Sequence, residues 1–358
     1  MIEKKRILVA PLNWGLGHAT RCIPVINRLS AFGFEVLLAS DGEALELLKA
    51  EFPGKATVVL PSYNISYKTQ NMLRNIAPQV PRLFATVRKE RKVLQNMIKK
   101  HQIDAVLSDN RYGLYTRDIP CIFMTHQLNI LTPYACLERL TKILNHYFIR
   151  KFSACWVPDF EQELSLAGRL SHSTKLDNLV YIGLLSRMKS LKRPKKYDLM
   201  AILSGPEPQR SFFEKKIIQQ ATQLPIKVLL VRGKPQEKRQ VVRHLNMEIH
   251  NYMTSSMLNE KIAESGLVLA RSGYSTLMDL TKIGGIISIL VPTAGQTEQI
   301  YLARRFAEKG YFICQNQTNF NLKRALEQTQ QLKGFPKMRN SAELLDQAIE
   351  QLSTLLKN

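Results

Sequence analysis

The strongest constraint on the fold is a regular alternation of short apolar runs with amphipathic segments. Residues 7–10 form a continuous apolar run of the kind that is buried on both faces of a parallel sheet. A glycine-containing turn follows, then a segment with apolar residues at helical spacing, and then a second strand at residues 35–40. Further strands and one long helix continue the pattern at residues 56–60, 71–100, 105–107 and 121–124. This alternation predicts a doubly wound parallel sheet.

A basic segment interrupts this pattern in the middle of the chain. Residues 187–196 read RMKSLKRPKK, which is typical of a solvated linker rather than of a core element. The alternation restarts with a strand at residues 198–203 and continues to a strand at 286–291. We therefore expect two Rossmann-like α/β domains that face each other across a cleft. They span residues 1–188 and 197–358, with a linker at 189–196, and the last helix could pack back on the first domain.

The charge of the chain is the outlying number in its composition. The 358 residues include 51 Lys and Arg against 29 Asp and Glu, which gives a formal net charge of +22. Such a charge attracts an anion, whether nucleic acid, an anionic membrane or a phosphorylated substrate. Composition alone does not choose among these three.

The cysteines and the hydropathy pattern bear on the compartment. The five cysteines form no Cys-x-x-Cys pair, which indicates reduced thiols rather than a disulfide framework or a zinc site. No apolar run approaches the ~20 residues that a membrane span needs. We expect a cytoplasmic protein that contacts a membrane only peripherally.

The turn after the first strand contains a candidate catalytic group. Gly15 and Gly17 let the backbone approach a ligand closely, and the helix that begins there presents free amides to an anion. His18 is expected to act as a general base or an anion ligand, unless it merely caps the helix. A base needs an orienting partner, and Asp109 follows the strand at 105–107 at the same edge of the sheet.

The loop after the strand at 121–124 opens onto the same edge. His126 and Asn129 are expected to hold the acceptor there. For Asn129 the alternative is a structural role, because asparagine side chains often bond backbone groups in turns.

The second domain contains a similar strand-to-helix turn. Ser272 and Gly273 could bind an anion at the helix N-terminus, and the Asp279 carboxylate could accept hydrogen bonds from two ribose hydroxyls. The alternative is a plain capped helix with a solvated Asp279. The polar loop after the next strand favours a binding site, because its amides and carboxylate suit sugar hydroxyls. The residues expected to bind the donor are Gly15, Gly17, Ser204, Gly205, Arg271, Ser272, Gly273, Ser275, Thr276, Asp279, Gln296, Glu298 and Gln299.

Five motifs, taken together, resemble those of one enzyme family. They are Gly15-Leu16-Gly17-His18, the loop 125–129, the turn Ser204-Gly205, the segment 271–279 and the pair Glu298-Gln299. Together they resemble the MurG-like glycosyltransferases of family 28, which have the GT-B architecture. The segment 271–279 is the most similar, with Asp279 where that family has the glutamate that binds the donor ribose. The departures are Gln127, Leu128, Pro206, Pro208 and Glu298, the last of which replaces a glutamine that contacts the donor sugar.

The resemblance implies an inverting transfer from a UDP-linked sugar, such as UDP-N-acetylglucosamine, to a hydroxyl of a membrane-associated or cell-envelope acceptor. It implies neither a cofactor nor a bound metal, and the sequence contains no Asp-x-Asp pair. Helix N-termini and Arg271 would then stabilise the leaving diphosphate. His18, or a carboxylate such as Asp109, would remove the proton of the acceptor hydroxyl.

Two other classes of protein stay open at this point. Gly15-Leu16-Gly17-His18, followed by Arg21-Cys22, also resembles UDP-sugar hydrolases of the pseudaminic acid pathway, in which water is the acceptor. An RNA-binding protein would explain the charge, but no RNP-like strand, KH-type loop or zinc spacing supports it. We therefore expect a nucleotide-sugar donor and a lipid-linked or envelope acceptor as partners, rather than nucleic acid.

A basic and apolar stretch between residues 68 and 117 suggests where an anionic membrane could bind. Each cation near an anionic leaflet contributes roughly 1 kcal/mol, so that four or five would suffice for reversible docking. The alternative is a packed helix with a solvated basic face, and Pro78 and Pro81 indicate that part of the stretch is a loop. The stretch comprises Lys68, Arg74, Arg82, Arg88, Lys89, Arg91, Lys92, Lys99, Lys100, Arg111 and Arg117, interleaved with Met72, Leu73, Ile76, Val80, Leu83, Phe84 and Val87.

Overall fold

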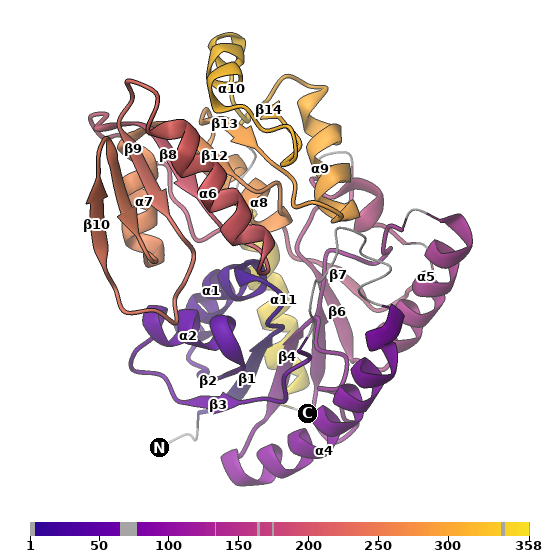
Figure 1. Ribbon diagram of the computed structural model, residues 1–358. Helices are drawn as coiled ribbons and strands as arrows, with labels where there is room; N and C mark the ends of the chain where they lie inside the picture. The colour runs from indigo at the N-terminus through magenta and orange to yellow at the C-terminus, as the bar shows by residue number, and fades with distance from the viewer. Residues whose placement is uncertain are drawn as a thin grey trace.

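Two seven-stranded sheets organise the chain, and helices pack against both of them (Figure 1). The structure is a computed structural model that describes residues 4–64, 77–132, 134–162, 165–173, 175–337 and 341–357. Each sheet belongs to its own α/β domain, and the strands follow one another in a doubly wound order. The predicted fold class of two parallel-sheet domains is therefore confirmed.

The first sheet is parallel throughout, in the order β3-β2-β1-β4-β5-β6-β7. Its strands are β1 (Arg6–Pro11), β2 (Glu35–Ser40), β3 (Thr57–Val59), β4 (Ala105–Asp109), β5 (Cys121–Met124), β6 (Ala154–Val157) and β7 (Leu179–Tyr181). Its helices are α1 (Leu16–Ala31), α2 (Gly42–Glu51), α4 (Val80–His101) and α5 (Ala135–Ile149). On β1, Ile7 and Val9 pack in the cluster that contains α1, whereas Leu8 and Ala10 pack on the α4 side. Burial on both faces explains why the strand is apolar throughout.

The second sheet has the order β10-β11-β9-β8-β12-β13-β14, and only β10 runs antiparallel to its neighbour. Its strands are β8 (Tyr197–Ile202), β9 (Val228–Val231), β10 (Val241–His244), β11 (Met247–His250), β12 (Ser265–Ala270), β13 (Ile287–Leu290) and β14 (Ile313–Cys314). Its helices are α6 (Gln209–Ala221), α7 (Ser255–Ala263), α8 (Tyr274–Ile283), α9 (Thr297–Ala307) and α10 (Leu322–Gln328). Short 3₁₀ turns lie at Ala77–Gln79, Gly168–Leu170 and Thr329–Gln331.

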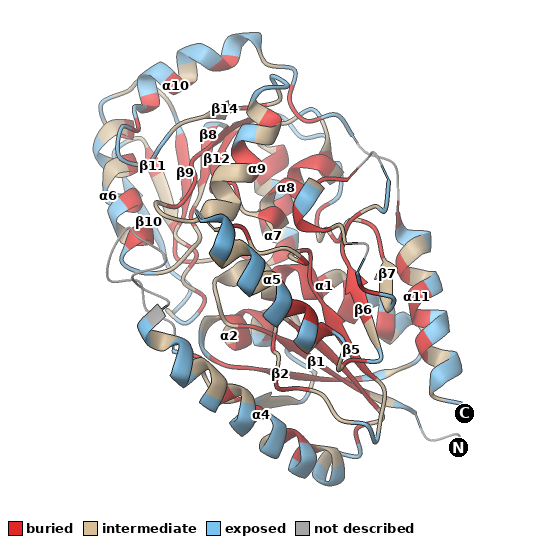
Figure 2. Ribbon diagram, turned by 90° about the vertical axis from the view of Figure 1, so that its right-hand side faces the viewer, coloured by how far each residue is buried: buried red, intermediate tan, exposed pale blue. Residues whose placement is uncertain are grey.

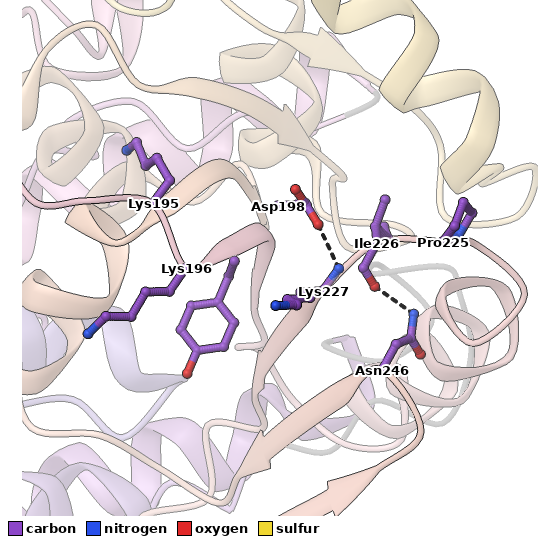
Figure 3. A pocket seen from close by; sticks show the side chains of 8 residues that line it. Lys195, Lys196, Asp198, Pro225, Ile226, Lys227 and Asn246 are labelled. Carbon is purple, nitrogen blue, oxygen red and sulfur yellow. Dashed lines mark hydrogen bonds between the residues drawn. The ribbon is translucent and has the colours of Figure 1, made fainter.

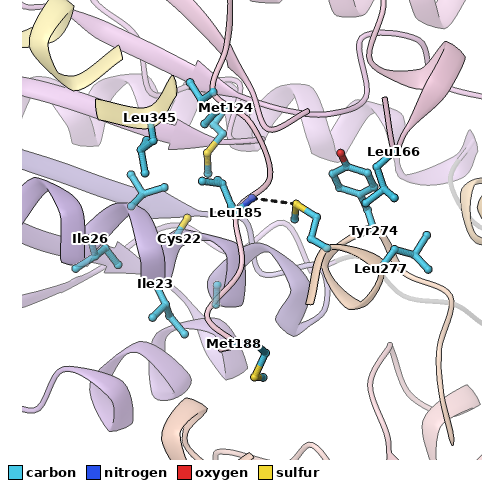
Figure 4. Packing of buried hydrophobic residues seen from close by; sticks show 14 of the residues in the cluster. Cys22, Ile23, Ile26, Met124, Leu166, Leu185, Met188, Tyr274, Leu277 and Leu345 are labelled. Atoms are coloured by element: carbon cyan, nitrogen blue, oxygen red, sulfur yellow. Dashed lines mark hydrogen bonds between the residues drawn. The ribbon is translucent and has the colours of Figure 1, made fainter. Parts of the chain in front are cut away.

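The chain passes from the first domain to the second between β7 and β8, and residues 189–196 form neither helix nor strand. After the second sheet, α11 (Ala342–Leu355) returns to the first domain. Leu345 and Ile349 of this helix share a buried cluster with Ile26 of α1, and Arg28 donates to Asp346. Figure 4 shows Leu345 near Met124 and on the same side as Ile26. The last helix is therefore part of the core of the first domain.

The same apolar cluster also joins the two domains. It contains Cys22 of α1 and Leu277 and Met278 of α8. Between them, the backbone amide of Leu185 donates to the sulfur of Met278 at 3.4 Å (Figure 4). The relative position of the domains is therefore held by packed side chains as well as by the linker.

The expected helix at 71–100 appears as α4, which begins at Val80, with Pro81 in its first turn. Proline is tolerated at this position because the first-turn amides have no partner within the helix. The expected residues Lys68, Met72, Leu73, Arg74 and Ile76 lie outside the described residues. Among the helices that the structure describes, none combines the length and the apolar character that crossing a bilayer requires.

Candidate active site

Two adjoining cavities lie where the carboxyl ends of the two sheets meet. The larger, here called the cleft cavity, has a volume of about 240 Å³. It is lined by the turn after β1, the loop after β5, the turn after β8 and the N-termini of α8 and α9. The smaller, the side cavity, has about 90 Å³ and continues along α8 to Asp279. Carboxyl ends of parallel strands are where α/β proteins bind their ligands.

The predicted pair of His18 and Asp109 meets at the cleft cavity. His18 lies in the first turn of α1 and lines the cavity, with 16% of its side chain exposed. Its Nδ1 is 3.0 Å from the Oδ1 of Asp109, the last residue of β4. Asp109 is completely buried behind it. The geometry therefore lets Asp109 orient the ring, and it gives the contact with a substrate to His18 alone.

A buried arginine holds this pair in place. Arg21 lies one turn after His18 on α1, and only 2% of its surface is exposed. Its Nε donates to Asp109 Oδ2 at 2.7 Å, and its Nη2 donates to the other carboxylate oxygen. Its Nη1 donates to His126 Nδ1 at 2.8 Å. One guanidinium therefore fixes side chains that come from two neighbouring strand ends.

His126 continues the hydrogen-bonded chain into the second domain. Because arginine can only donate, His126 Nδ1 must be an acceptor, and the ring proton must lie on Nε2. This nitrogen donates to Glu298 Oε1 at 2.8 Å, and the amide of Gln127 donates to Glu298 Oε2. The ring of His126 stacks on Tyr274 with 4.1 Å between centroids. The loop after β5 therefore holds the Glu298 carboxylate, at the start of α9, through two hydrogen bonds.

These contacts set the charges of the site. Burial acts to raise the pKa of Asp109, but Arg21 and His18 outweigh it and lower that pKa to about 2. Burial lowers the pKa of His126, which fits the neutral ring that the hydrogen bonds require. Burial acts to raise the pKa of Glu298, but His126, His18 and Arg21 hold it below its usual value. Asp109 and Glu298 are therefore both carboxylates at neutral pH.

Two glycines in this turn have different roles, one in the backbone conformation and one in the contact with the second domain. Gly15 has a φ of +84°, a backbone conformation that other residues rarely adopt. At Gly17 a Cβ atom would lie 3.2 Å from Ser275 Oγ, which itself donates to the Gly17 carbonyl at 2.8 Å. A side chain at position 17 would therefore require the Ser275 hydroxyl to shift by a few tenths of an ångström.

Comparison with known proteins identifies the enzyme class of the chain. Residues 208–353 match the Glycosyltransferase family 28 C-terminal domain. An uncharacterized glycosyltransferase of Methanosarcina mazei is 24% identical over 337 residues, which cover 86% of this chain and 84% of the relative. One from Methanosarcina acetivorans is also 24% identical, over 330 residues. The chain is a glycosyltransferase.

Solved structures show the same architecture. The calicheamicin glycosyltransferase CalG4 matches with a TM-score of 0.64 at 13% identity, covering 100% of this chain and 99% of its own. MurG of Acinetobacter baumannii matches with a TM-score of 0.56 at 14% identity, covering 98% and 100%. The glycosyltransferase therefore has the GT-B fold, as the resemblance of its motifs implied. These matches support neither the hydrolase nor the RNA-binding alternative.

The cleft of the glycosyltransferase brings together most of the residues expected to bind the donor. Those lining the two cavities are Gly15, Gly17, Ser204, Gly205, Gly273, Ser275, Thr276, Asp279, Gln296, Glu298 and Gln299. Ser272 is buried beneath them, and its hydroxyl donates to the Gln299 carbonyl at 2.9 Å. This bond ties the start of α8 to the start of α9, so that Ser272 positions the site without lining it.

Asp279 lies in the side cavity with two residues that sequence analysis did not single out. Its Oδ1 accepts a hydrogen bond of 2.6 Å from Ser186, and its Oδ2 is 3.8 Å from Arg187 Nε. Burial raises the pKa of Asp279, and Arg187 and Ser186 act against this rise. Of these two residues Arg187 lines the cavity, and it is the first residue of the basic segment 187–196 that was expected to be a solvated linker.

Two predicted residues lie away from the cavities. Arg271 is 1% exposed, and its guanidinium donates to the carbonyls of Gln209, Val291 and Pro292 and lies 4.3 Å from the Phe213 ring centre. Burial lowers its pKa to about 9. The expected direct contact with a diphosphate therefore does not follow from its position. Asn129 donates to the carbonyls of Arg169 and His172, which is the structural alternative named for it.

A further cavity of about 430 Å³ lies at the opposite, amino-terminal edge of the second sheet (Figure 3). Its polar groups serve the fold, since Asp198 accepts from the Lys227 amide and Asn246 donates to the Ile226 carbonyl. It contains none of the predicted site residues. Over the described ranges, no three His, Cys, Asp or Glu side chains are grouped so that they could hold a metal ion.

Proposed function

We propose that the glycosyltransferase moves a sugar from a UDP-linked donor to the hydroxyl of a membrane-associated acceptor, with inversion at the anomeric carbon. The observation that carries this proposal is the cleft cavity itself. One wall presents the oriented base His18, and the other presents the N-termini of α8 and α9 with Asp279 beyond them. This arrangement suits an acceptor on the first domain and a nucleotide sugar on the second.

The chemistry follows from the position of His18. His18 Nδ1 lies 3.0 Å from both Asp109 Oδ1 and Arg21 Nη2. In the tautomer that directs an Nδ1 proton to the carboxylate, the Nε2 lone pair is free to take the proton of the acceptor hydroxyl. The acceptor oxygen forms the new bond to the anomeric carbon as the bond from that carbon to the diphosphate oxygen breaks. The bonding electron pair leaves with the diphosphate. Asp109 cannot take the proton itself, because it is buried and already paired with Arg21.

The leaving diphosphate carries the charge that develops in this step. We propose that amides at the N-terminus of α8, the hydroxyls of Ser275 and Thr276 and the turn at Gly205 bind it, without a metal ion or other cofactor. Asp279 would accept the ribose hydroxyls in the side cavity, which Arg187 also lines.

Thermal-shift measurements with UDP-, GDP- and dTDP-sugars test the donor assignment. A ligand that binds only the native state raises the unfolding temperature by mass action. We expect UDP-sugars to raise it most in the wild type, and Asp279→Ala to lose most of this shift. Asp279→Glu is the matched control and should keep it. Equal shifts with all three nucleotides, or an unchanged shift in Asp279→Ala, would contradict the proposal.

The membrane-associated acceptor is supported by the surface of the first domain. Four exposed apolar side chains of α5 lie at helical spacing, Leu140, Ile143, Leu144 and Tyr147. The neighbouring helix α4 exposes seven cations, Arg82, Arg88, Lys89, Arg91, Lys92, Lys99 and Lys100. Both helices turn exposed residues to the viewer in Figure 2. We call these side chains together the α4–α5 surface, and propose that it docks at an anionic membrane on its cytoplasmic side.

A further inference from the structure

One of the charges around His18 comes from the second domain. Arg21 of α1 and Asp109 of β4 form a buried ion pair that uses both carboxylate oxygens. His126 is held as a neutral ring by the donor at its Nδ1. The remaining charge is the Glu298 carboxylate, which α9 brings from the second domain. The cluster therefore has one cation and two anions, a net charge of −1.

Three further titratable groups among the described residues face this cluster and are neutral, and the buried side chain of Asp159 lies beyond one of them, Tyr274. Burial raises the pKa of Cys22, whose thiol lies 3.6 Å from Asp109 Oδ2. Burial likewise raises the pKa of Tyr274, which stacks on His126, and that of Tyr112 on the acceptor side of the cavity. A proton taken up by His18 would bring the whole cluster to neutrality. Without Glu298, the same proton would leave an uncompensated charge in a buried site, which is costly.

We propose that the Glu298 carboxylate is the counter-charge of the protonated His18 ring. The second domain thereby increases the proton affinity of the proposed catalytic base. Asp109 fixes the direction of the ring, but Arg21 has already neutralised its charge. Glu298 lines the same cavity as His18, and hydrogen bonds from His126 and Gln127 hold both of its carboxylate oxygens in place there. It is a positioning residue with an electrostatic role, and opening of the domains would weaken the base. This inference rests on the proposed role of His18.

The direct test is the titration of the His18 ring, followed by NMR in the full chain with labelled histidine. The chain has seven histidines, and loss of one signal in His18→Ala assigns the ring. Removing the negative charge in Glu298→Gln keeps the side chain's shape. We expect this change to move the His18 titration midpoint about one pH unit lower, a tenfold change in proton affinity. The measurement is made without ligand and with UDP as the probe.

A second variant should move the midpoint in the opposite direction. Arg21→Gln removes the cation, so the proton on His18 becomes easier to hold and the midpoint rises. If this variant does not fold, the Glu298→Gln result decides alone. Glu43→Gln is the matched control, because Glu43 also pairs across the domains, with Arg210 at 3.0 Å, but does not line the cavity. It should leave the midpoint within about 0.2 units.

A kinetic readout separates the inference from the proposed function. In Glu298→Gln the acidic limb of kcat/KM should move to lower pH together with the NMR midpoint, while kcat falls about five- to tenfold. An unchanged or higher midpoint in Glu298→Gln would overturn the role of Glu298 even if His18→Ala is inactive. Full activity of His18→Ala would instead overturn the base assignment on which the inference rests.

Discussion

The guanidinium of Arg21 contacts three side chains at once, those of Asp109, His126 and His18. Sequence analysis predicted His18 and Asp109, because residues that follow strands gather at one edge of a parallel sheet. It gave Arg21 no role, although the spacing of three residues from His18 places both on one face of a helix. What the sequence lacks is the path of each side chain, and that path decides that Arg21 points inward to Asp109 and His126 whereas Arg271 points away from the cleft.

The role of His18 gives a prediction for catalysis. His18→Ala should lower kcat about a hundredfold or more, because it removes the general base. The affinity for UDP should stay within about threefold, since the proposed nucleotide site lies on the second domain. Transfer rates and calorimetric UDP binding, measured on the same preparations, check this. A parallel loss of UDP affinity would show that His18 serves mainly as a ligand.

The charge of Asp109 gives a prediction for stability. Its pKa of about 2 in the folded protein lies below the ordinary value of 3.8. Its ionised form therefore stabilises the fold fully above pH 4, and this contribution is lost as the pH falls from about 4 to about 2. Asp109→Asn leaves the charge of Arg21 unpaired and should cost about 3–5 kcal/mol near pH 6.

The pH dependence of this loss in the free energy of unfolding shows whether it arises from the charge of Asp109 or from its packing. The difference in the free energy of unfolding between the two proteins should narrow by about 1 kcal/mol at pH 3, because Asp109 is by then mostly protonated in the unfolded wild type but still mostly ionised in the folded one. Urea unfolding at several pH values measures it. A gap that stays constant down to pH 3 would mean that Asp109 is not the ionised partner of Arg21.

Among the secondary-structure elements, α4 and α5 show most clearly what periodicity does and does not reveal. The predicted membrane edge between residues 68 and 117 combined cations with apolar side chains. In the structure Leu83, Phe84 and Val87 are half-buried, and the rings of Phe84 and Phe148 of α5 are 6.2 Å apart. Arg111 is completely buried in ion pairs with Asp41 and Glu90. The described part of that stretch therefore supplies cations, and the exposed apolar row lies on α5.

The reason is that apolar residues at positions i, i+3, i+4 and i+7 indicate that a helix has an apolar face, but not whether this face points to the core or to solvent.

The hairpin of β10 and β11 was not predicted, for a related reason. Its turn has Leu245 at a φ of +51°, without the Asn-Gly or Gly-Gly pair that marks such turns. The buried strands were predictable, since burial on two faces needs apolar residues throughout.

The α5 row gives a prediction for membrane binding. Wild-type protein should co-float at low salt with vesicles that contain phosphatidylglycerol. The double variant Leu140→Gln, Ile143→Gln should bind at least about tenfold more weakly, because both side chains are more than half exposed in water and would lose their apolar contact. Phe212→Gln on α6 is the control, with the same loss of an exposed apolar group elsewhere. Wild type that stays unbound at low salt, or equal flotation of the double variant, would contradict the proposed docking.

On the scale of the whole molecule, the two domains are parts of one packed body. The shared apolar cluster crosses the cleft floor, and α11 returns from the second domain to the first. The sequence predicted the two domains from their repeated strand–helix pattern. How tightly they would be joined could not be predicted from it, because the contacts link residues as distant as Arg28 and Asp346.

This continuity predicts a single unfolding transition. Both tryptophans, Trp14 and Trp156, lie in the first domain, so that their fluorescence reports on that domain, whereas circular dichroism reports on both. Ile349→Ala in α11 removes a completely buried side chain and should cost about 2–5 kcal/mol. We expect both signals to shift to lower temperature together. Two separate transitions, or a shift in only one signal, would show that the domains unfold independently.

The return of α11 also orders events during synthesis. A ribosome makes α1 first, but the helix that packs against Ile26 and Arg28 emerges only after the entire second domain. Part of the apolar face of α1 therefore has no packing partner until more than 300 further residues have been translated and α11 has been made. A chain that ends before residue 342 would therefore lack part of the core of the first domain.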